Sequence, residues 1–148
     1  MRIEKDFKEF IELLNEHSVR YLVVGGFAYS FHAEPRFTKD IDIFVEGSKE
    51  NAGKLLKVFA AFGFEDLGLT MDDFIGPGEV VQLGVEPVRI DVMTSITGVD
   101  FAPAWENRVS GNYGDVPVYF ISKADLILNK AAVGRKQDLS DIDKLQRI

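Results

Sequence analysis

The stretch from Arg20 to Phe44 constrains the fold more than any other part of this 148-residue chain. It opens with a short β-rich run at 20–24, apolar from Tyr21 on, that ends at Gly25-Gly26, the composition of a buried strand closed by a turn. It closes with the alternation Asp-Ile-Asp-Ile at 40–43, which has the period of two that a strand requires. A buried strand, a glycine turn and a second, half-polar strand predict an α/β domain.

The remaining segments carry the patterns of further helices and strands. Helical periodicity, helix-stopping glycines and an N-cap serine at position 122 predict helices over 4–17, 26–33, 49–62, 122–133 and 139–148. Short apolar runs predict strands over 20–25, 40–45, 80–85, 88–93 and 116–121, with Glu86-Pro87 as the turn of an antiparallel pair. We therefore expect a single α/β (α+β) domain over residues 1–148, with a mixed sheet of about five strands flanked by helices.

Composition excludes several classes of protein. The balance of 24 acidic and 17 basic residues gives a net charge of −7, which argues against an extended nucleic-acid-binding surface. The absence of cysteine excludes a disulfide framework and a thiolate metal site. The longest apolar run, 21–31, is too short to span a bilayer, and the first residues do not resemble a signal peptide. We expect no membrane contact and a cytoplasmic location.

Three aspartates are the candidate catalytic and metal-binding residues. Strand alternation places Asp40 and Asp42 on one face, and the same logic turns Asp91 outward from the run Arg-Ile-Asp-Val at 89–92. If the two strands are neighbours, the three carboxylates converge, and like charges about 4 Å apart repel by roughly 4 kcal/mol at an effective dielectric of 20. A divalent cation removes this repulsion, and carboxylates suit Mg²⁺ or Mn²⁺. Two such ions can support an in-line displacement at phosphorus.

The glycine pair is the candidate phosphate site. Gly25 and Gly26 let the backbone approach a phosphate closely, and the start of the following helix favours an anion. Arg36 and Thr38, in the segment before the Asp-Ile-Asp-Ile strand, are candidates for further nucleotide contacts, although both could simply fix that loop. A plain turn and a solvated acidic strand face are the simpler explanations of the two patterns. Their combination favours the binding of a nucleoside triphosphate (NTP) with its metal.

The order of these motifs resembles the DNA polymerase β-type nucleotidyltransferase superfamily: a Gly-Gly turn, a short helix, an Arg-x-Thr-x-Asp-x-Asp strand and a lone aspartate in a later strand. The chain is most similar to small (minimal) bacterial members of the Gly-Gly branch, such as lincosamide and aminoglycoside nucleotidyltransferases and abortive-infection toxin–antitoxin proteins. The motifs cover residues 20–95. A weaker similarity covers 123–145, where Lys130 begins a Lys-then-Arg-x-x-Asp-Leu pattern.

The resemblance implies a nucleotidyltransferase fold and a role for each residue. Asp40 and Asp42 would bind two ions, Asp91 would bind the catalytic ion and orient the attacking hydroxyl, and the glycines would hold the triphosphate. Lys130 is a candidate for a further triphosphate contact.

The implied activity is an Mg²⁺-dependent transfer of NMP from NTP to a hydroxyl acceptor on a small molecule, a protein or an RNA end, with release of pyrophosphate. We expect no counterpart of the large C-terminal substrate domain usual in the superfamily within these 148 residues. The alternative is therefore a nucleotide-binding, antitoxin-like or regulatory module that keeps the metal site but acts mainly on a partner protein or as a homo-oligomer.

Overall fold

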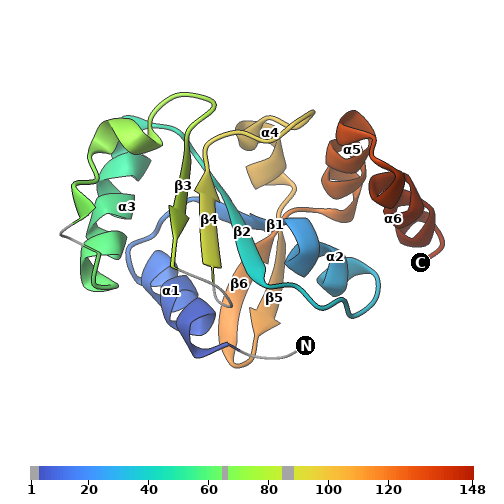
Figure 1. Ribbon diagram of the computed structural model, residues 1–148, viewed down its shortest axis with the longest axis horizontal. Coiled ribbons are helices and arrows are strands. Elements are labelled where there is room, and N and C mark those ends of the chain that lie inside the picture. Colours follow the sequence, from blue (N-terminus) through green and yellow to red (C-terminus); the bar gives the residue numbers. More distant parts are fainter. Residues whose placement is uncertain (1–3, 65–66, 85–88) are drawn as a thin grey trace.

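A computed structural model describes residues 4–64, 67–84 and 89–148 (Figure 1). Its helices are α1 (Lys5–Glu16), α2 (Gly25–His32), α3 (Lys49–Ala61), the 3₁₀ helix η2 (Met71–Phe74), α4 (Phe101–Glu106), α5 (Lys123–Val133) and α6 (Lys136–Gln146). Its strands are β1 (Tyr21–Val24), β2 (Asp40–Val45), β3 (Val80–Leu83), β4 (Arg89–Met93), β5 (Val109–Tyr113) and β6 (Val116–Phe120). The predicted alternation of helices and strands is confirmed.

The strands form one mixed sheet in the order β3-β4-β2-β1-β6-β5. The β2–β4 and β1–β6 pairs are parallel, and the other neighbouring pairs are antiparallel. The mixed α/β architecture is confirmed, with six strands instead of five. The extra strand, β5, lies at an edge of the sheet and is polar in sequence because Ser110 and Asn112 lie on its exposed face.

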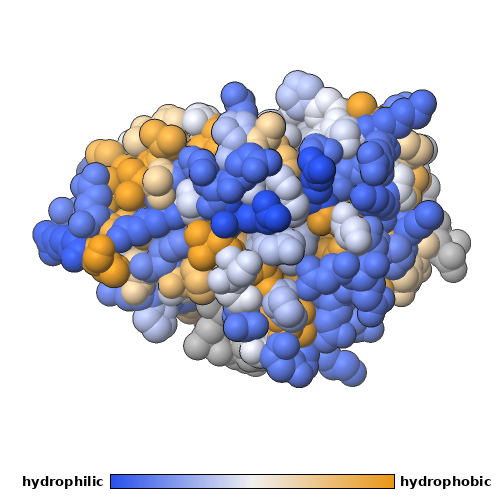
Figure 2. Space-filling view, turned by 180° about the vertical axis from the view of Figure 1, so that it is seen from behind, coloured by the Kyte–Doolittle hydropathy of each residue, from blue (hydrophilic) through white to orange (hydrophobic). Residues whose placement is uncertain are grey.

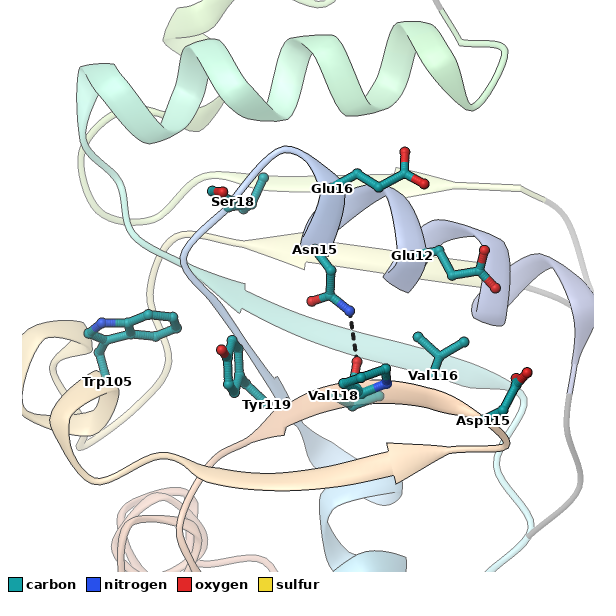
Figure 3. Close-up of a pocket in the computed structure, with 11 residues that line it drawn as sticks. Glu12, Asn15, Glu16, Ser18, Trp105, Asp115, Val116, Val118 and Tyr119 are labelled. Atoms are coloured by element: carbon teal, nitrogen blue, oxygen red, sulfur yellow. Dashed lines mark hydrogen bonds between the residues drawn. The ribbon is translucent and has the colours of Figure 1, made fainter.

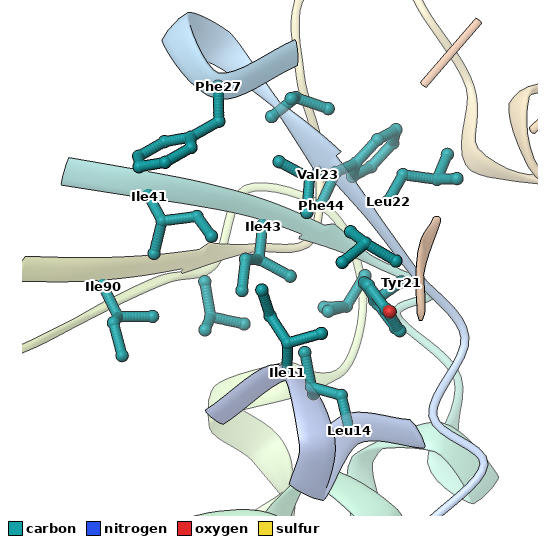
Figure 4. Close-up of a cluster of buried hydrophobic side chains, with 14 of the residues drawn as sticks. Ile11, Leu14, Tyr21, Leu22, Val23, Phe27, Ile41, Ile43, Phe44 and Ile90 are labelled. Atoms are coloured by element: carbon teal, nitrogen blue, oxygen red, sulfur yellow. The ribbon is translucent and has the colours of Figure 1, made fainter. Parts of the chain in front are cut away.

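The main core lies between the sheet and helices α1 and α3. Ile11 and Leu14 of α1 point toward Ile43 of β2, among the buried side chains of the central strands (Figure 4). Ile41 and Ile43 are 1% and 0% exposed, so the predicted inward face of the Asp-Ile-Asp-Ile strand is confirmed. Burial of that apolar face forces the aspartates to the opposite face of the sheet.

Helix ends follow local hydrogen bonds. The hydroxyl oxygens of Ser48 and Ser122 cap α3 and α5 by accepting from backbone N–H groups three residues on, and Gly134 ends α5 with φ 72°. The predicted start of the last helix at 139 is wrong: α6 begins at Lys136, because the Asp138 carboxylate accepts from the Arg135 N–H at 3.1 Å.

Some predictions concern segments without a strong periodic pattern. Helix α4 was not predicted, since six residues interrupted by Pro103 show little periodicity. The antiparallel β3–β4 pair is confirmed, while its predicted turn, Glu86-Pro87, lies outside the described residues. Within the described ranges, none of the helices combines the length and the apolar character needed to cross a membrane. Seen from behind, the surface is mostly hydrophilic with scattered apolar patches (Figure 2).

Candidate active site

Parallel pairing of β2 with β4 brings the predicted aspartates together. Asp42 lies opposite Asp91, and Asp40 lies opposite Arg89. Paired residues of neighbouring strands point to the same face of a sheet, so all four side chains share the face opposite α1 and α3. The expectation that the two strands are neighbours is confirmed. Asp91 is only 7% exposed, so its carboxylate sits in a largely dry environment.

The glycine turn adjoins this carboxylate face. Val24, the last residue of β1, pairs with Asp42, so Gly25 follows directly beside that aspartate. Gly25 has φ +64°, and a Cβ on it would collide with the Asp42 carboxylate. Helix α2 starts at Gly25, which places its first backbone N–H groups next to the aspartates. The start of α2 and the acidic side chains therefore meet at one point, and phosphate binding by Gly25 and Gly26 stays a prediction.

The carboxylates resist ionising together. Burial, together with the neighbouring charges of Asp91 and Asp40, raises the pKa of Asp42 to about 7. Burial also raises the pKa of Asp91, while the Arg89 guanidinium opposes that change. Strongly shifted acids at a shared position are typical of a functional site. Added positive charge would favour the ionised forms.

Arg89 already supplies one positive charge. Its Nη2 donates to Asp40 Oδ2 at 2.8 Å, and its Nε lies 3.3 Å from Asp91 Oδ1. The second pair lacks hydrogen-bond geometry, so Arg89 Nε and Asp91 Oδ1 are buried without a hydrogen-bond partner. Arg89 is a site residue that the sequence patterns do not single out. Its position two residues before Asp91 was the available signal, since strand residues i and i+2 share a face.

The donor set suits a hard divalent cation, but not in the present arrangement. Within the described part of the chain, no group of three or more His, Cys, Asp or Glu side chains is arranged to hold a metal ion. Asp40 is instead paired with Arg89. The carboxylate oxygens are nevertheless the ligands that Mg²⁺ and Mn²⁺ prefer. Asp91 Oδ1 is buried without a hydrogen bond, a cost that a cation would relieve. The residues therefore fit a metal once Asp40 is free.

Of the other predicted nucleotide contacts, Thr38 lies next to this face, whereas Arg36 and Lys130 share a carboxylate partner elsewhere. Thr38 packs against Gly26 and donates its hydroxyl to the Asp40 carbonyl at 2.8 Å. Arg36 and Lys130 both donate to the carboxylate of Asp141, each at 2.9 Å. Asp141 is fully buried and also accepts from Gln137, so this cluster fastens α6 to the segment before β2. Direct contact of Arg36 or Lys130 with a nucleotide stays a prediction.

A separate cavity of about 680 Å³ lies among α1, α4 and β6 (Figure 3). Trp105 and Tyr119 form part of its wall, and Asn15 donates across it to the Pro117 carbonyl at 2.7 Å. Its lining includes none of the predicted site residues. The carboxylate face, not this cavity, carries the chemistry that the sequence indicates.

Comparisons with known proteins agree with this fold. A family model described as "Nucleotidyltransferase of unknown function (DUF6036)" matches residues 2–146. No curated protein matches the sequence.

Three solved structures show the same fold. The lincosamide antibiotic adenylyltransferase LnuA, bound to lincomycin, is similar with a TM-score of 0.61 and 21% identity, covering 97% of this chain and 96% of that one. The antibiotic-resistance factor ANT(2'')-Ia is similar with a TM-score of 0.60 and 14% identity, covering 96% and 81%. The same factor in complex with adenylyl-2''-tobramycin gives 0.57 and 14%, covering 95% and 86%.

Proposed function

The chain belongs to the DUF6036 nucleotidyltransferase family, and we propose that it transfers an NMP group from an NTP to a hydroxyl acceptor, releasing pyrophosphate. One observation carries the proposal: Asp42 and Asp91 are paired across β2 and β4, immediately beside Gly25 at the start of α2. This arrangement joins an acidic face to a glycine turn that admits a phosphate. The reaction needs both features at one place.

The aspartates would hold divalent ions, Mg²⁺ or Mn²⁺. Asp42 and Asp91 face each other, and Asp40 would join them after leaving Arg89. When bound, such ions neutralise the developing charge on the phosphate oxygens and lower the pKa of a coordinated hydroxyl. Because the pKa of Asp42 is raised to about 7, a nearby positive charge would increase the ionised fraction of this carboxylate near neutral pH.

The triphosphate would lie at the N-terminus of α2. There the glycine pair removes the side chains that would block a close approach, and the unpaired N–H groups of the first turn donate to phosphate oxygens. Thr38 supports this turn by packing against Gly26. The chain would thus hold the nucleotide mainly through backbone groups, which orient the phosphates without any need for a large basic surface.

A small molecule is the acceptor class that we propose. The similar structures are described as an antibiotic adenylyltransferase bound to lincomycin and a resistance factor in complex with adenylyl-2''-tobramycin. The net charge of −7 disfavours an RNA end, because a polyanion would be repelled. In this proposal Asp91, which pairs with Asp42 and lies 3.3 Å from Arg89 Nε, would accept the hydroxyl proton.

The partner-module alternative has less support. It started from the lack of a large second domain, yet the match to LnuA covers 96% of that enzyme's chain. The chain is therefore not shorter than that adenylyltransferase by a domain. Retention of the aspartates together with the glycine turn favours the enzyme.

The proposal is tested by incubating the purified protein with each of four labelled NTPs, Mg²⁺ or Mn²⁺, and a pool of small hydroxyl compounds. We expect label transfer, reduced on the order of 10³-fold in Asp42→Asn, because a ligand to the reacting centre is lost. Asp143→Asn is the matched control, since Asp143 lies on α6 in an exposed pair with Arg147. Absence of transfer and of metal–nucleotide binding in the wild type would rule the proposal out.

A further inference from the structure

Arg89 is a permanent cation inside the predicted metal site. It lies opposite Asp40 and two residues before Asp91, and its guanidinium contacts one carboxylate oxygen of each. Only 34% of its side chain is exposed. The guanidinium of an arginine is always charged in a protein. The charge can leave the site only if the side chain moves.

The guanidinium and a divalent cation would compete for the same oxygens. An Mg²⁺ ligand must approach to about 2.0–2.1 Å, whereas Asp40 Oδ2 is already held by Arg89 Nη2 at 2.8 Å. The ion would also be repelled by a positive charge a few ångströms away, in surroundings where Asp91 is 7% exposed and screening by water is weak. Binding of the ion through Asp40 and release of Arg89 are therefore coupled.

We propose that Arg89 is a counterion of the carboxylate site that prevents the binding of a free divalent cation. When a divalent cation arrives together with a nucleotide, the Arg89 side chain leaves the carboxylates and the cation binds them. The inference rests on the proposed function of the same site. A triphosphate brings its own negative charge, which gives the displaced guanidinium a new partner next to the turn at Gly25. Arg89 is in this sense a positioning residue: it acts through Asp40 and Asp91.

The proposal and a purely structural role of Arg89 predict opposite changes in metal affinity when Arg89 is removed. If Arg89 only supported the strands, its removal would loosen the aspartates and weaken metal binding. If it competes with the metal, its removal tightens the binding of the free ion. One contact favours competition. The Nε of Arg89 and the Oδ1 of Asp91 are both buried without a hydrogen bond, so their 3.3 Å approach is electrostatic and can be replaced by another cation.

The test is calorimetric titration with Mn²⁺ alone, which needs no turnover. We expect Arg89→Gln to bind Mn²⁺ about tenfold more tightly than the wild type, because a nearby unit charge has been removed. Arg89→Lys keeps the charge and should stay within about threefold of the wild type. The matched control is Arg20→Gln, which breaks the exposed Arg20–Glu46 pair of 3.1 Å and should leave Mn²⁺ binding unchanged.

A second titration uses Mn²⁺ with a non-hydrolysable NTP analogue. The difference in Mn²⁺ affinity between Arg89→Gln and the wild type should be smaller in this titration, because the triphosphate neutralises the charge of the guanidinium in the wild type. If Arg89→Gln does not fold, the wild type labelled with ¹⁵N at arginine replaces it: the Arg89 Nε–H resonance should shift on addition of Mg²⁺ and the analogue, and much less with Mg²⁺ alone.

The outcomes separate this inference from the proposed function. Equal or weaker Mn²⁺ binding by folded Arg89→Gln, or an Arg89 resonance that never responds, overturns the counterion role. If the wild type still binds Mn²⁺ with the analogue and loses it in Asp42→Asn, the proposed function survives that result. If no variant binds Mn²⁺ with or without the analogue, both fall.

Discussion

Gly25 and Asp42 approach each other so closely across β1 and β2 that a side chain at position 25 has no room. A Cβ there would collide with the carboxylate of Asp42, and φ of +64° already favours glycine. This contact fixes the phosphate turn against the acidic face. It is the structural link between the two motifs that are fifteen residues apart at Gly25 and Asp40 in the sequence.

Replacing Gly25 by alanine should damage function more than stability. The left-handed backbone costs an alanine roughly 1–2 kcal/mol, and the Asp42 carboxylate must then rotate away from the site. Gly134→Ala is the control, because Gly134 has φ +72° but its nearest neighbour would be 3.6 Å away. Urea unfolding should show similar losses for both variants, whereas label transfer should disappear only in Gly25→Ala. Equal activity in the two would contradict the contact.

Gly26 should tolerate a serine. A Cβ there would lie 3.3 Å from Thr38 Cβ, tight but open to small adjustment, and this glycine has no left-handed backbone. We expect Gly26→Ser to change the free energy of unfolding by less than about 1 kcal/mol and to preserve nucleotide binding. Denaturant melts and a titration with an NTP analogue check both points, and loss of folding would show that Thr38 cannot yield.

The metal-free protein should lose stability as pH rises from about 4 to 7. The pKa of Asp42 is raised in the folded state to about 7 from an ordinary value of 3.8, so the folded chain holds a proton that the unfolded chain releases. The contribution of that proton to stability is fully present below the pKa of Asp42 in the unfolded chain. It is lost as the pH rises through the pKa of Asp42 in the folded chain, about 7. Asp91, whose pKa is also raised, acts in the same direction.

Thermal melts in EDTA at several pH values measure this slope. Asp42→Asn should flatten it, because asparagine does not titrate, while Asp143→Asn on the exposed face of α6 should leave it unchanged. Saturating Mn²⁺ should also reduce the slope in the wild type by stabilising the ionised carboxylate. The absolute slope also includes His32, whose pKa is lowered by burial and which acts in the opposite direction. Equal slopes in the wild type and in Asp42→Asn would therefore contradict the burial of Asp42.

Asp141 should be the most sensitive acidic residue for stability. It is fully buried and receives hydrogen bonds from Arg36, Lys130 and Gln137, and these contacts hold its pKa well below the ordinary range. Removing the carboxylate leaves a buried lysine without its closest partner, at a cost of about 3–5 kcal/mol for Asp141→Ala.

The comparison within α6 is Asp143→Ala, whose exposed pair with Arg147 should be worth less than about 1 kcal/mol. Urea unfolding of both variants gives the two free energies directly. Similar small losses would mean that the Asp141 cluster does not fasten α6 to the rest of the domain.

Much of the fold could be predicted because local patterns and burial agree. The alternation at 40–43 gives β2 its bounds, and a helical stripe of buried residues (Phe7, Phe10, Ile11 and Leu14) gives α1. Helix α4 and strand β5 escaped prediction because a proline-interrupted turn and a polar edge strand carry little periodic signal. The start of α6 was misplaced because the Asp138 contact with Arg135 extends the helix by one turn.

The sequence by itself determined which residues share a face: alternation alone places Asp40 with Asp42 and turns Asp91 outward. Only the tertiary structure decided which of them meet. Parallel register sets Asp42 against Asp91 and Arg89 against Asp40, and the packing of α6 draws Arg36 and Lys130 onto Asp141. The physical reason is that periodicity is a property of neighbours along the chain, whereas pairing register and ion-pair partners depend on contacts between segments far apart in it.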